Sequence, residues 1–174
     1  MRVRKRIVSA ALMLSILAVG GRLWAASGSP VPPEAIFSGK FTASLTINYT
    51  DVEKVTGTAS ALGVLTLDGK GGVTGSFGAV SPEDQASGQA TCSVTIAPST
   101  YTVNSNVTAG TFSLVFPGAG STNGTLNFNL SIYRSALFAL TANMVGTNQN
   151  PSGLVICSKA ISSAAYTGLL TETR

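Results

Sequence analysis

The sequence predicts an all-β protein, in which a single antiparallel meander barrel of about eight strands follows an N-terminal signal helix. Three observations support this prediction. Beyond Ile36, apolar and polar residues alternate with a period of two, which is typical of strands with one buried face. Short turns rich in glycine, asparagine or serine separate the alternating segments. No segment after the leader shows the period of about 3.6 residues that marks an amphipathic helix.

The first 25 residues have the three parts of a secretory signal peptide. Residues 1–6 are basic, residues 7–21 are apolar, and small residues surround a cleavage point expected after Ala25 or Ala26. The apolar run is shorter than the roughly 20 residues that a membrane-spanning helix needs. We therefore expect export to the periplasm or the extracellular space, with membrane contact only through the leader. An uncleaved leader that anchors the chain is the alternative.

Residues 26–35 form the predicted linker, because three prolines with glycine and serine exclude a regular helix and favour an extended spacer. The barrel domain is expected over residues 36–174, which is enough chain to bury one core. Its first strand covers residues 41–50, where five apolar residues alternate with threonine, serine and asparagine. A hairpin of residues 55–67 and 73–80 follows, joined by the glycine-rich turn 68–72.

The remaining strands are also bounded by turn residues. Residues 81–85 are predicted as a loop. The strands that follow are expected at residues 90–96, 101–103, 107–116, 125–133, 136–143, 153–160 and 166–171. Because the connections are mostly short, consecutive strands are expected to pair antiparallel, as a closed barrel or as two sheets. We predict the barrel, because closure removes exposed strand edges. A chain with so few charged residues would protect such edges poorly against pairing with other chains.

The distribution of charge argues against a nucleic-acid partner. The whole chain has a formal charge of +4, but five of its eleven basic residues precede residue 26. The remainder carries six basic and seven acidic residues and has no basic patch to contact phosphates. The chain also contains no histidine, which excludes serine–histidine and cysteine–histidine catalysis and imidazole metal ligands.

The two cysteines, Cys92 and Cys157, are predicted to form one disulfide, because an even count in an exported chain most simply means pairing. They lie 65 positions apart, and closing a loop of that length stabilises a domain by about 4 kcal/mol in the chain-entropy model. A reactive thiol pair is the alternative. It has little support, since the spacing is not C-x-x-C and Lys159 is the only cationic residue close by in sequence.

Three segments carry a resemblance to small exported bacterial proteins of unassigned function. They are residues 61–75, with a glycine-rich hairpin, residues 100–104, with Tyr-Thr-Val-Asn, and the amphipathic hairpin 128–140. The chain departs from the family pattern at Leu67, where an aromatic is usual, and at Asn106-Val107, where an Asp-Gly turn is expected. The resemblance implies a small antiparallel barrel similar to the calycins or to the allene-oxide-cyclase barrel. It implies no catalytic residues.

The sequence offers no convincing catalytic, metal or cofactor site. Residues 69–75 are rich in glycine but lack the spacing of a phosphate-binding loop and precede a strand. Asp51 and Glu53 are the one carboxylate pair on a common strand face, and they are expected in a solvated turn. We therefore predict no catalytic residues, no metal ligands and no cofactor.

The resulting hypothesis is an exported, non-catalytic barrel that binds a small apolar ligand inside or a cell-surface partner outside. Barrel isomerases or cyclases and small outer-membrane barrels are the alternatives. The residues name neither the partner nor the oligomeric state. The candidate lining of the barrel interior or mouth consists of seven aromatic residues: Phe41, Tyr49, Phe77, Tyr101, Phe112, Phe128 and Tyr133.

Overall fold

A computed structural model describes residues 31–84, 88–89, 91–118, 122–134, 140–149 and 153–173. Pro32–Arg174 is one compact unit. The predicted signal peptide, its cleavage point and the first part of the predicted linker lie outside the described residues. Within the described residues there is no helix long and apolar enough to cross a membrane.

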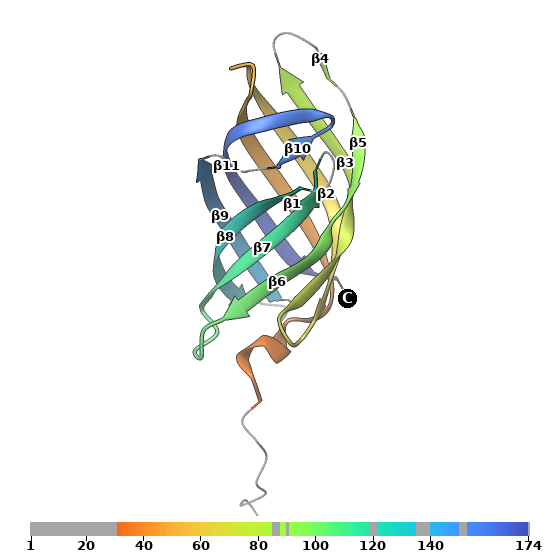
Figure 1. Cartoon of the computed structure of the whole chain (residues 1–174). Helices are drawn as coiled ribbons and strands as arrows, with labels where there is room; N and C mark the ends of the chain where they lie inside the picture. The colour runs from red at the N-terminus through yellow and green to blue at the C-terminus, as the bar shows by residue number, and fades with distance from the viewer. Residues whose placement is uncertain are drawn as a thin grey trace, which may run out of the picture. The chain divides into compact units, whose positions relative to one another are not determined.

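Eight antiparallel strands close into a barrel, which confirms the predicted fold class (Figure 1). The first strand, β1, pairs with β2 on one side and with the last strand, β11, on the other. This second pairing closes the sheet. Around the wall, the strands are β1 (Ser38–Asp51), β2 (Thr56–Asp68), β3 (Gly72–Asp84), β6 (Ala97–Val103), β7 (Ala109–Pro117), β8 (Asn123–Arg134), β9 (Leu140–Gln149) and β11 (Lys159–Glu172).

Four smaller elements complete the described structure. Two short strands, β4 (Gly88–Gln89) and β5 (Cys92–Thr95), pair with β3, and β5 continues the path of β6 along the wall. A third, β10 (Val155–Ile156), forms a small hairpin with the start of β11. The 3-10 helix η1 (Pro33–Ile36) precedes β1. In Figure 1, η1 and the β10 hairpin lie at opposite ends of the barrel.

The structure corrects several predicted boundaries. Residues 81–84 continue β3 rather than forming a loop, because they pair with residues 57–60 of β2. Strand β9 runs to Gln149 rather than ending at residue 143, because β11 pairs along this polar stretch. Residues 153–160 form a tight hairpin instead of one strand. The end of the predicted linker forms η1, where a proline in the first turn suits the 3-10 conformation.

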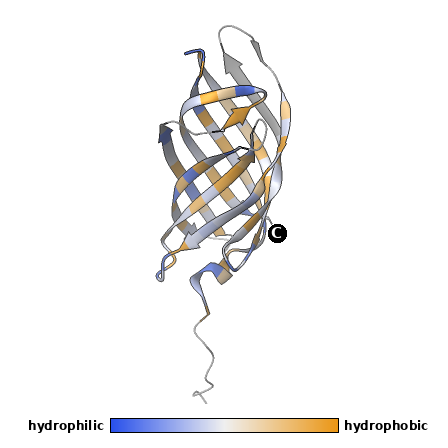
Figure 2. Cartoon of the chain, in the orientation of Figure 1, coloured by the Kyte–Doolittle hydropathy of each residue, from blue (hydrophilic) through white to orange (hydrophobic). Residues whose placement is uncertain are grey.

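Side chains alternate between the two faces of the wall as the sequence predicts. Along β1, for example, Phe41, Ala43, Leu45, Ile47 and Tyr49 are buried and the residues between them are exposed or half-buried. Apolar and polar residues alternate along the strands in Figure 2. The outward residues of the described strands are mainly threonine, serine and asparagine, and Leu62, Val64, Val145 and Leu169 are the large aliphatic exceptions on the barrel strands. A membrane-spanning barrel has the reverse pattern, which argues against the outer-membrane alternative.

Candidate functional site

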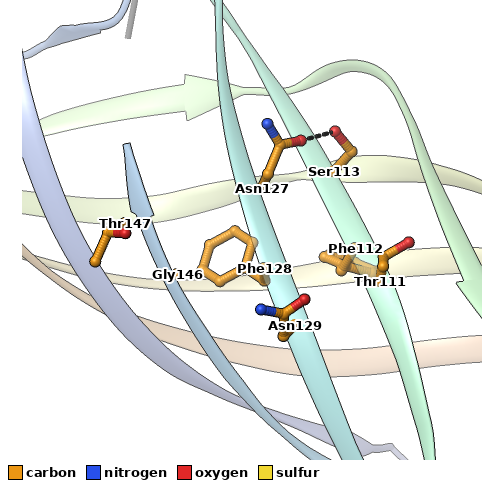
Figure 3. Close-up of a pocket in the computed structure, with 8 residues that line it drawn as sticks. All are labelled: Thr111, Phe112, Ser113, Asn127, Phe128, Asn129, Gly146 and Thr147. Atoms are coloured by element: carbon orange, nitrogen blue, oxygen red, sulfur yellow. Dashed lines mark hydrogen bonds between the residues drawn. The ribbon is translucent and has the colours of Figure 1, made fainter. Parts of the chain in front are cut away.

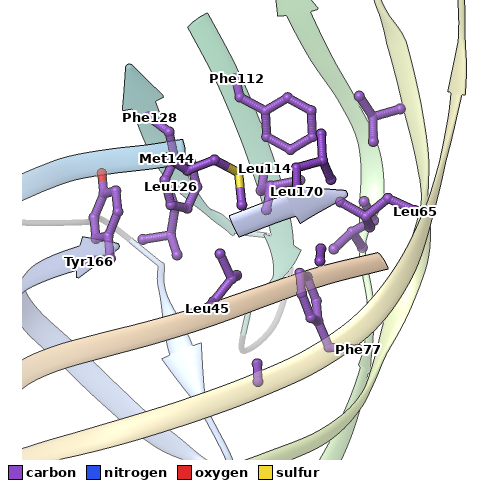
Figure 4. Close-up of a cluster of buried hydrophobic side chains, with 14 of the residues drawn as sticks. Leu45, Leu65, Phe77, Phe112, Leu114, Leu126, Phe128, Met144, Tyr166 and Leu170 are labelled. Atoms are coloured by element: carbon purple, nitrogen blue, oxygen red, sulfur yellow. The ribbon is translucent and has the colours of Figure 1, made fainter. Parts of the chain in front are cut away.

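In the part of the barrel that the structure describes, the interior is filled by buried side chains. Eight strands enclose a space that is just wide enough for side chains to fill. Figure 4 shows leucine, phenylalanine and methionine side chains from strands around the wall converging on the axis. The most deeply buried large residues are Tyr166, Phe37, Phe41, Phe77, Phe112, Phe128, Leu65, Leu67, Leu114, Leu126, Met144 and Leu154.

The predicted aromatic lining residues differ in burial. Six of them, Phe41, Tyr49, Phe77, Tyr101, Phe112 and Phe128, are buried in the interior. Several pack ring against ring, such as Tyr101 with Phe112 and Phe112 with Phe128, each with centroids 6.5 Å apart. Tyr133 is different: it is 46 % exposed and takes an outward position in the alternation of β8. Its side chain therefore does not belong to the packed interior.

One end of the barrel is covered by η1. The ring of Phe37, the residue after η1, packs against Phe41 and Tyr101, with centroids 5.5 and 5.8 Å away. The Tyr101 hydroxyl donates to the carbonyl of Phe37 at 2.8 Å and lies 3.0 Å from the carbonyl of Glu34. The segment before β1 is thus attached to the wall by a buried polar contact.

The opposite end is covered by the β10 hairpin, residues 153–160. Its residues Leu154 and Ile156 are buried, at 2 % and 4 % exposure. The predicted disulfide is confirmed: Cys157, in the turn of the hairpin, is bonded to Cys92 on β5, with a Cα–Cα distance of 5.6 Å. The turn residues Cys157 and Ser158 both have positive φ angles, of 45° and 76°. The disulfide therefore holds a hairpin turn that contains no glycine.

A small apolar cavity lies under this hairpin. Its volume is about 20 Å³, and its lining includes Leu45, Phe116, Leu126 and Leu154. A volume of this size is close to that of a single water molecule, whereas ligand pockets usually measure about 300–1,000 Å³. This cavity does not accommodate an organic ligand without movement of the hairpin.

Tyr49 and Asp51 lie at the same end of β1. The Tyr49 hydroxyl is buried and has no hydrogen-bond partner among the described residues. Burial, with a smaller contribution from the charge of Asp51, raises the pKa of this phenol. Asp51 was expected in a solvated turn, but it is 5 % exposed, and its Oδ1 accepts the backbone N–H groups of Glu53 and Val55. Its carboxylate thus stabilises the β1–β2 turn.

A larger candidate site than this cavity lies on the outer face of the barrel, in a groove of about 500 Å³. Figure 3 shows this groove, which crosses β7, β8 and β9. We call it the β7–β9 groove. Phe112, Phe128 and Gly146 contribute to its floor, and its side walls carry the uncharged hydroxyl and amide groups of Thr111, Ser113, Asn127, Asn129 and Thr147.

The groove coincides with an interruption of the sheet. The pairing of β8 with β9 extends only as far as Asn129 opposite Val145. Beyond this point the Tyr166 hydroxyl, from β11, accepts the backbone N–H of Asn127 at 3.0 Å and donates to its carbonyl at 2.9 Å. The Asn148 amide donates to the Thr125 carbonyl at 3.1 Å. Side chains therefore replace the missing backbone ladder.

Two of the polar groups in the β7–β9 groove make no hydrogen bond to the described part of the chain, namely the side chains of Asn129 and Thr147. The others are partly used. Asn127 accepts a hydrogen bond from Ser113 through its amide oxygen, and the hydroxyls of Thr111 and Thr102 are paired. The groove thus offers the unpaired side chains of Asn129 and Thr147 beside side chains that are already hydrogen-bonded.

Sequence reasoning did not find the β7–β9 groove. The alternation along residues 125–133 places Asn127 and Asn129 on the outer face, which was the only available signal. Thr111 joins them because β7 pairs with β8, and Thr147 joins them on β9, two residues beyond the last pair of the β8–β9 ladder. Among the described residues, no group of three or more cysteine or acidic side chains is arranged to hold a metal ion.

Comparisons with protein-family models, with curated proteins and with solved structures found no match. The closed antiparallel barrel and its disulfide are compatible with the resemblance to exported barrel proteins, but no family match supports the calycin or allene-oxide-cyclase assignment.

Proposed function

We propose that this protein is an exported, non-catalytic binding module that contacts a cell-surface partner through the β7–β9 groove. The observation that carries the proposal is the contrast between two volumes. The cavity under the β10 hairpin measures about 20 Å³, whereas the groove outside measures about 500 Å³. The disulfide is consistent with an oxidising, exported compartment.

The strands that line the groove are packed against the barrel interior. Phe112 and Phe128 contribute to its floor and bury their rings in the packed interior. The ring of Phe128 is held in turn by Tyr166, with centroids 4.7 Å apart. Backbone segments supported in this way lose little conformational freedom when a partner binds, which favours affinity.

Photocrosslinking on intact cells tests this proposal. A p-benzoyl-phenylalanine in place of Asn129 lies in the groove, and the same group in place of Asn48 lies on the outer face of β1, away from the groove. Irradiation with cells of the producing organism should give a discrete adduct from position 129 and none from position 48. No adduct at position 129, or equal adducts at both positions, would contradict the proposal.

A second candidate function is the binding of a small apolar ligand inside the barrel, beneath a displaced β10 hairpin. The observation in its favour is the buried, unpartnered hydroxyl of Tyr49, which a ligand oxygen could satisfy. The buried aromatic residues would supply the apolar surface. A barrel isomerase or cyclase would use the same space.

Native mass spectrometry of the exported protein tests this second function. A small molecule released only on unfolding, and absent from the Tyr49→Phe variant, would support it. A bare mass in both proteins, two hydrogens below that of the reduced chain, would leave the groove as the better-supported site.

A further inference from the structure

We propose that the β7–β9 groove binds a neutral saccharide chain. This inference rests on the proposed function and names the chemical class of its ligand. Among the described residues, no acidic or basic side chain lines the groove, so it offers neither the cations that hold phosphates and carboxylates nor the carboxylates that hold cationic ligands. A neutral, polar ligand is the class that this lining fits.

The polar side chains that line the groove are amides and hydroxyls. An asparagine amide presents two donors on its nitrogen and an acceptor on its oxygen, and a threonine hydroxyl both donates and accepts. Sugar hydroxyls need donors and acceptors at short spacing. Asn127 and Asn129 project from the same face of β8, about 7 Å apart by strand geometry. The hydroxyl of Thr147, on the neighbouring strand β9, lines the same groove, and like the Asn129 amide it makes no hydrogen bond to the described part of the chain.

The backbone contacts of β8 at the end of the ladder argue against an added peptide strand. Where the β8–β9 ladder ends, a peptide could bind only to unpaired backbone groups. The N–H and C=O of Asn127 are already bonded to Tyr166, and the C=O of Thr125 is bonded to Asn148. Recognition at the groove therefore depends on side chains, as in saccharide binding.

An exposed aromatic ring extends this polar surface. Tyr133 lies on the same face of β8 as Asn129, four residues further along, which is about 13 Å in strand geometry. Aromatic rings pack against the C–H faces of sugars. A chain of several sugar units can thus use both the groove and this ring, which a monosaccharide cannot do.

Isothermal titration calorimetry with cellohexaose, maltohexaose and chitohexaose tests the inference on the full mature protein. At least one of these neutral hexamers should bind, and a hexamer of galacturonic acid should bind more weakly. Asn129→Ala and Thr147→Val should each weaken binding about tenfold, the loss expected for one hydrogen bond. Asn48→Ala, on β1, is the matched control and should bind as the unmodified protein does.

The outcomes separate this inference from the proposed function. If no neutral saccharide binds while position 129 still crosslinks to a protein on cells, the saccharide inference is wrong and the proposed function stands. If neither binding nor crosslinking occurs at the groove, both are wrong. Binding that survives both Asn129→Ala and Thr147→Val, with both variants folded as judged by thermal unfolding, also overturns the inference.

Discussion

The phenol hydroxyl of Tyr166 is bonded to both backbone polar groups of Asn127, 39 residues earlier in the chain. It occupies the place that a residue of β9 would take in an uninterrupted ladder. The ring reaches this position beside Gly146, where a Cβ would collide with Tyr166 and with the Asn127 carbonyl. The floor of the β7–β9 groove thus depends on one tyrosine and on the absence of a neighbouring side chain.

Tyr166→Phe should lower the free energy of unfolding by about 1–3 kcal/mol, because it leaves backbone N–H and C=O groups without a partner. Urea denaturation of the purified domain measures this difference. Tyr133→Phe removes a hydroxyl from an exposed tyrosine and should change stability by less than about 0.5 kcal/mol. Equal effects of the two substitutions would show that the Tyr166 hydroxyl has no special role.

Gly146→Ala should destabilise the barrel by about 1–3 kcal/mol, the usual cost of forcing an extra methyl group into a packed site. The control is Gly78→Ala on β3, where a Cβ would meet only the Leu62 carbonyl, at 3.9 Å. Thermal unfolding of the two variants checks the difference. A Gly146→Ala variant as stable as Gly78→Ala would contradict the described packing of Tyr166.

Val107 has a φ of 58°, in the left-handed region that is unfavourable for a β-branched residue. This is the position at which the related sequence pattern has a glycine. Val107→Gly should therefore be more stable than Val107→Ala by about 1 kcal/mol, because both lose the valine packing but only glycine relieves the backbone. Chemical denaturation of the two variants measures this difference in the free energy of unfolding. An alanine variant more stable than the glycine variant would refute the described turn.

Replacing Cys92 and Cys157 together by alanine should lower stability by about 4 kcal/mol. It should also increase hydrogen exchange at Leu154 and Ile156, since the β10 hairpin loses its covalent attachment. Reducing the unmodified protein with dithiothreitol should reproduce both effects. Unchanged exchange at these two residues would show that packing alone holds the hairpin in place.

Stability should be almost constant between about pH 5 and 9 and should fall above about pH 10. The chain has no histidine and its cysteines are oxidised, so no side chain has its ordinary pKa inside that interval. Burial raises the pKa of Tyr49, Tyr101 and Tyr166 above the ordinary value for a phenol.

The raised pKa values fix the sign of this dependence. A raised folded-state pKa gives stability that is present below pH 10 and is lost as the pH rises through the folded value. At the acid end, backbone N–H groups of Lys70 and Gly72 lower the pKa of Asp68, so its contribution is lost as the pH falls through that lowered value. Urea denaturation across the pH range checks both limits, and a transition near pH 6.5 would contradict this account.

The alternation of Phe41 to Tyr49 was enough to predict β1, and the two cysteines were enough to predict the disulfide, because both are local or countable features of the chain. The groove was not predictable in this way. Its shape depends on the Tyr166 hydroxyl finding Asn127 from another strand, which alternation alone does not specify. Tyr133 lies outside the packed core because the alternation of β8 puts it on the same face as Asn127 and Asn129.

Methyl-resolved NMR tests the central claim most directly. The mature protein, labelled at the methyl groups of threonine and leucine, is titrated with a soluble extract of the cell envelope of its own organism. The account predicts shifts for Thr111 and Thr147 in the groove and none for Leu45 and Leu126 in the interior. Shifts confined to the interior leucines, with both threonines unchanged, would contradict it.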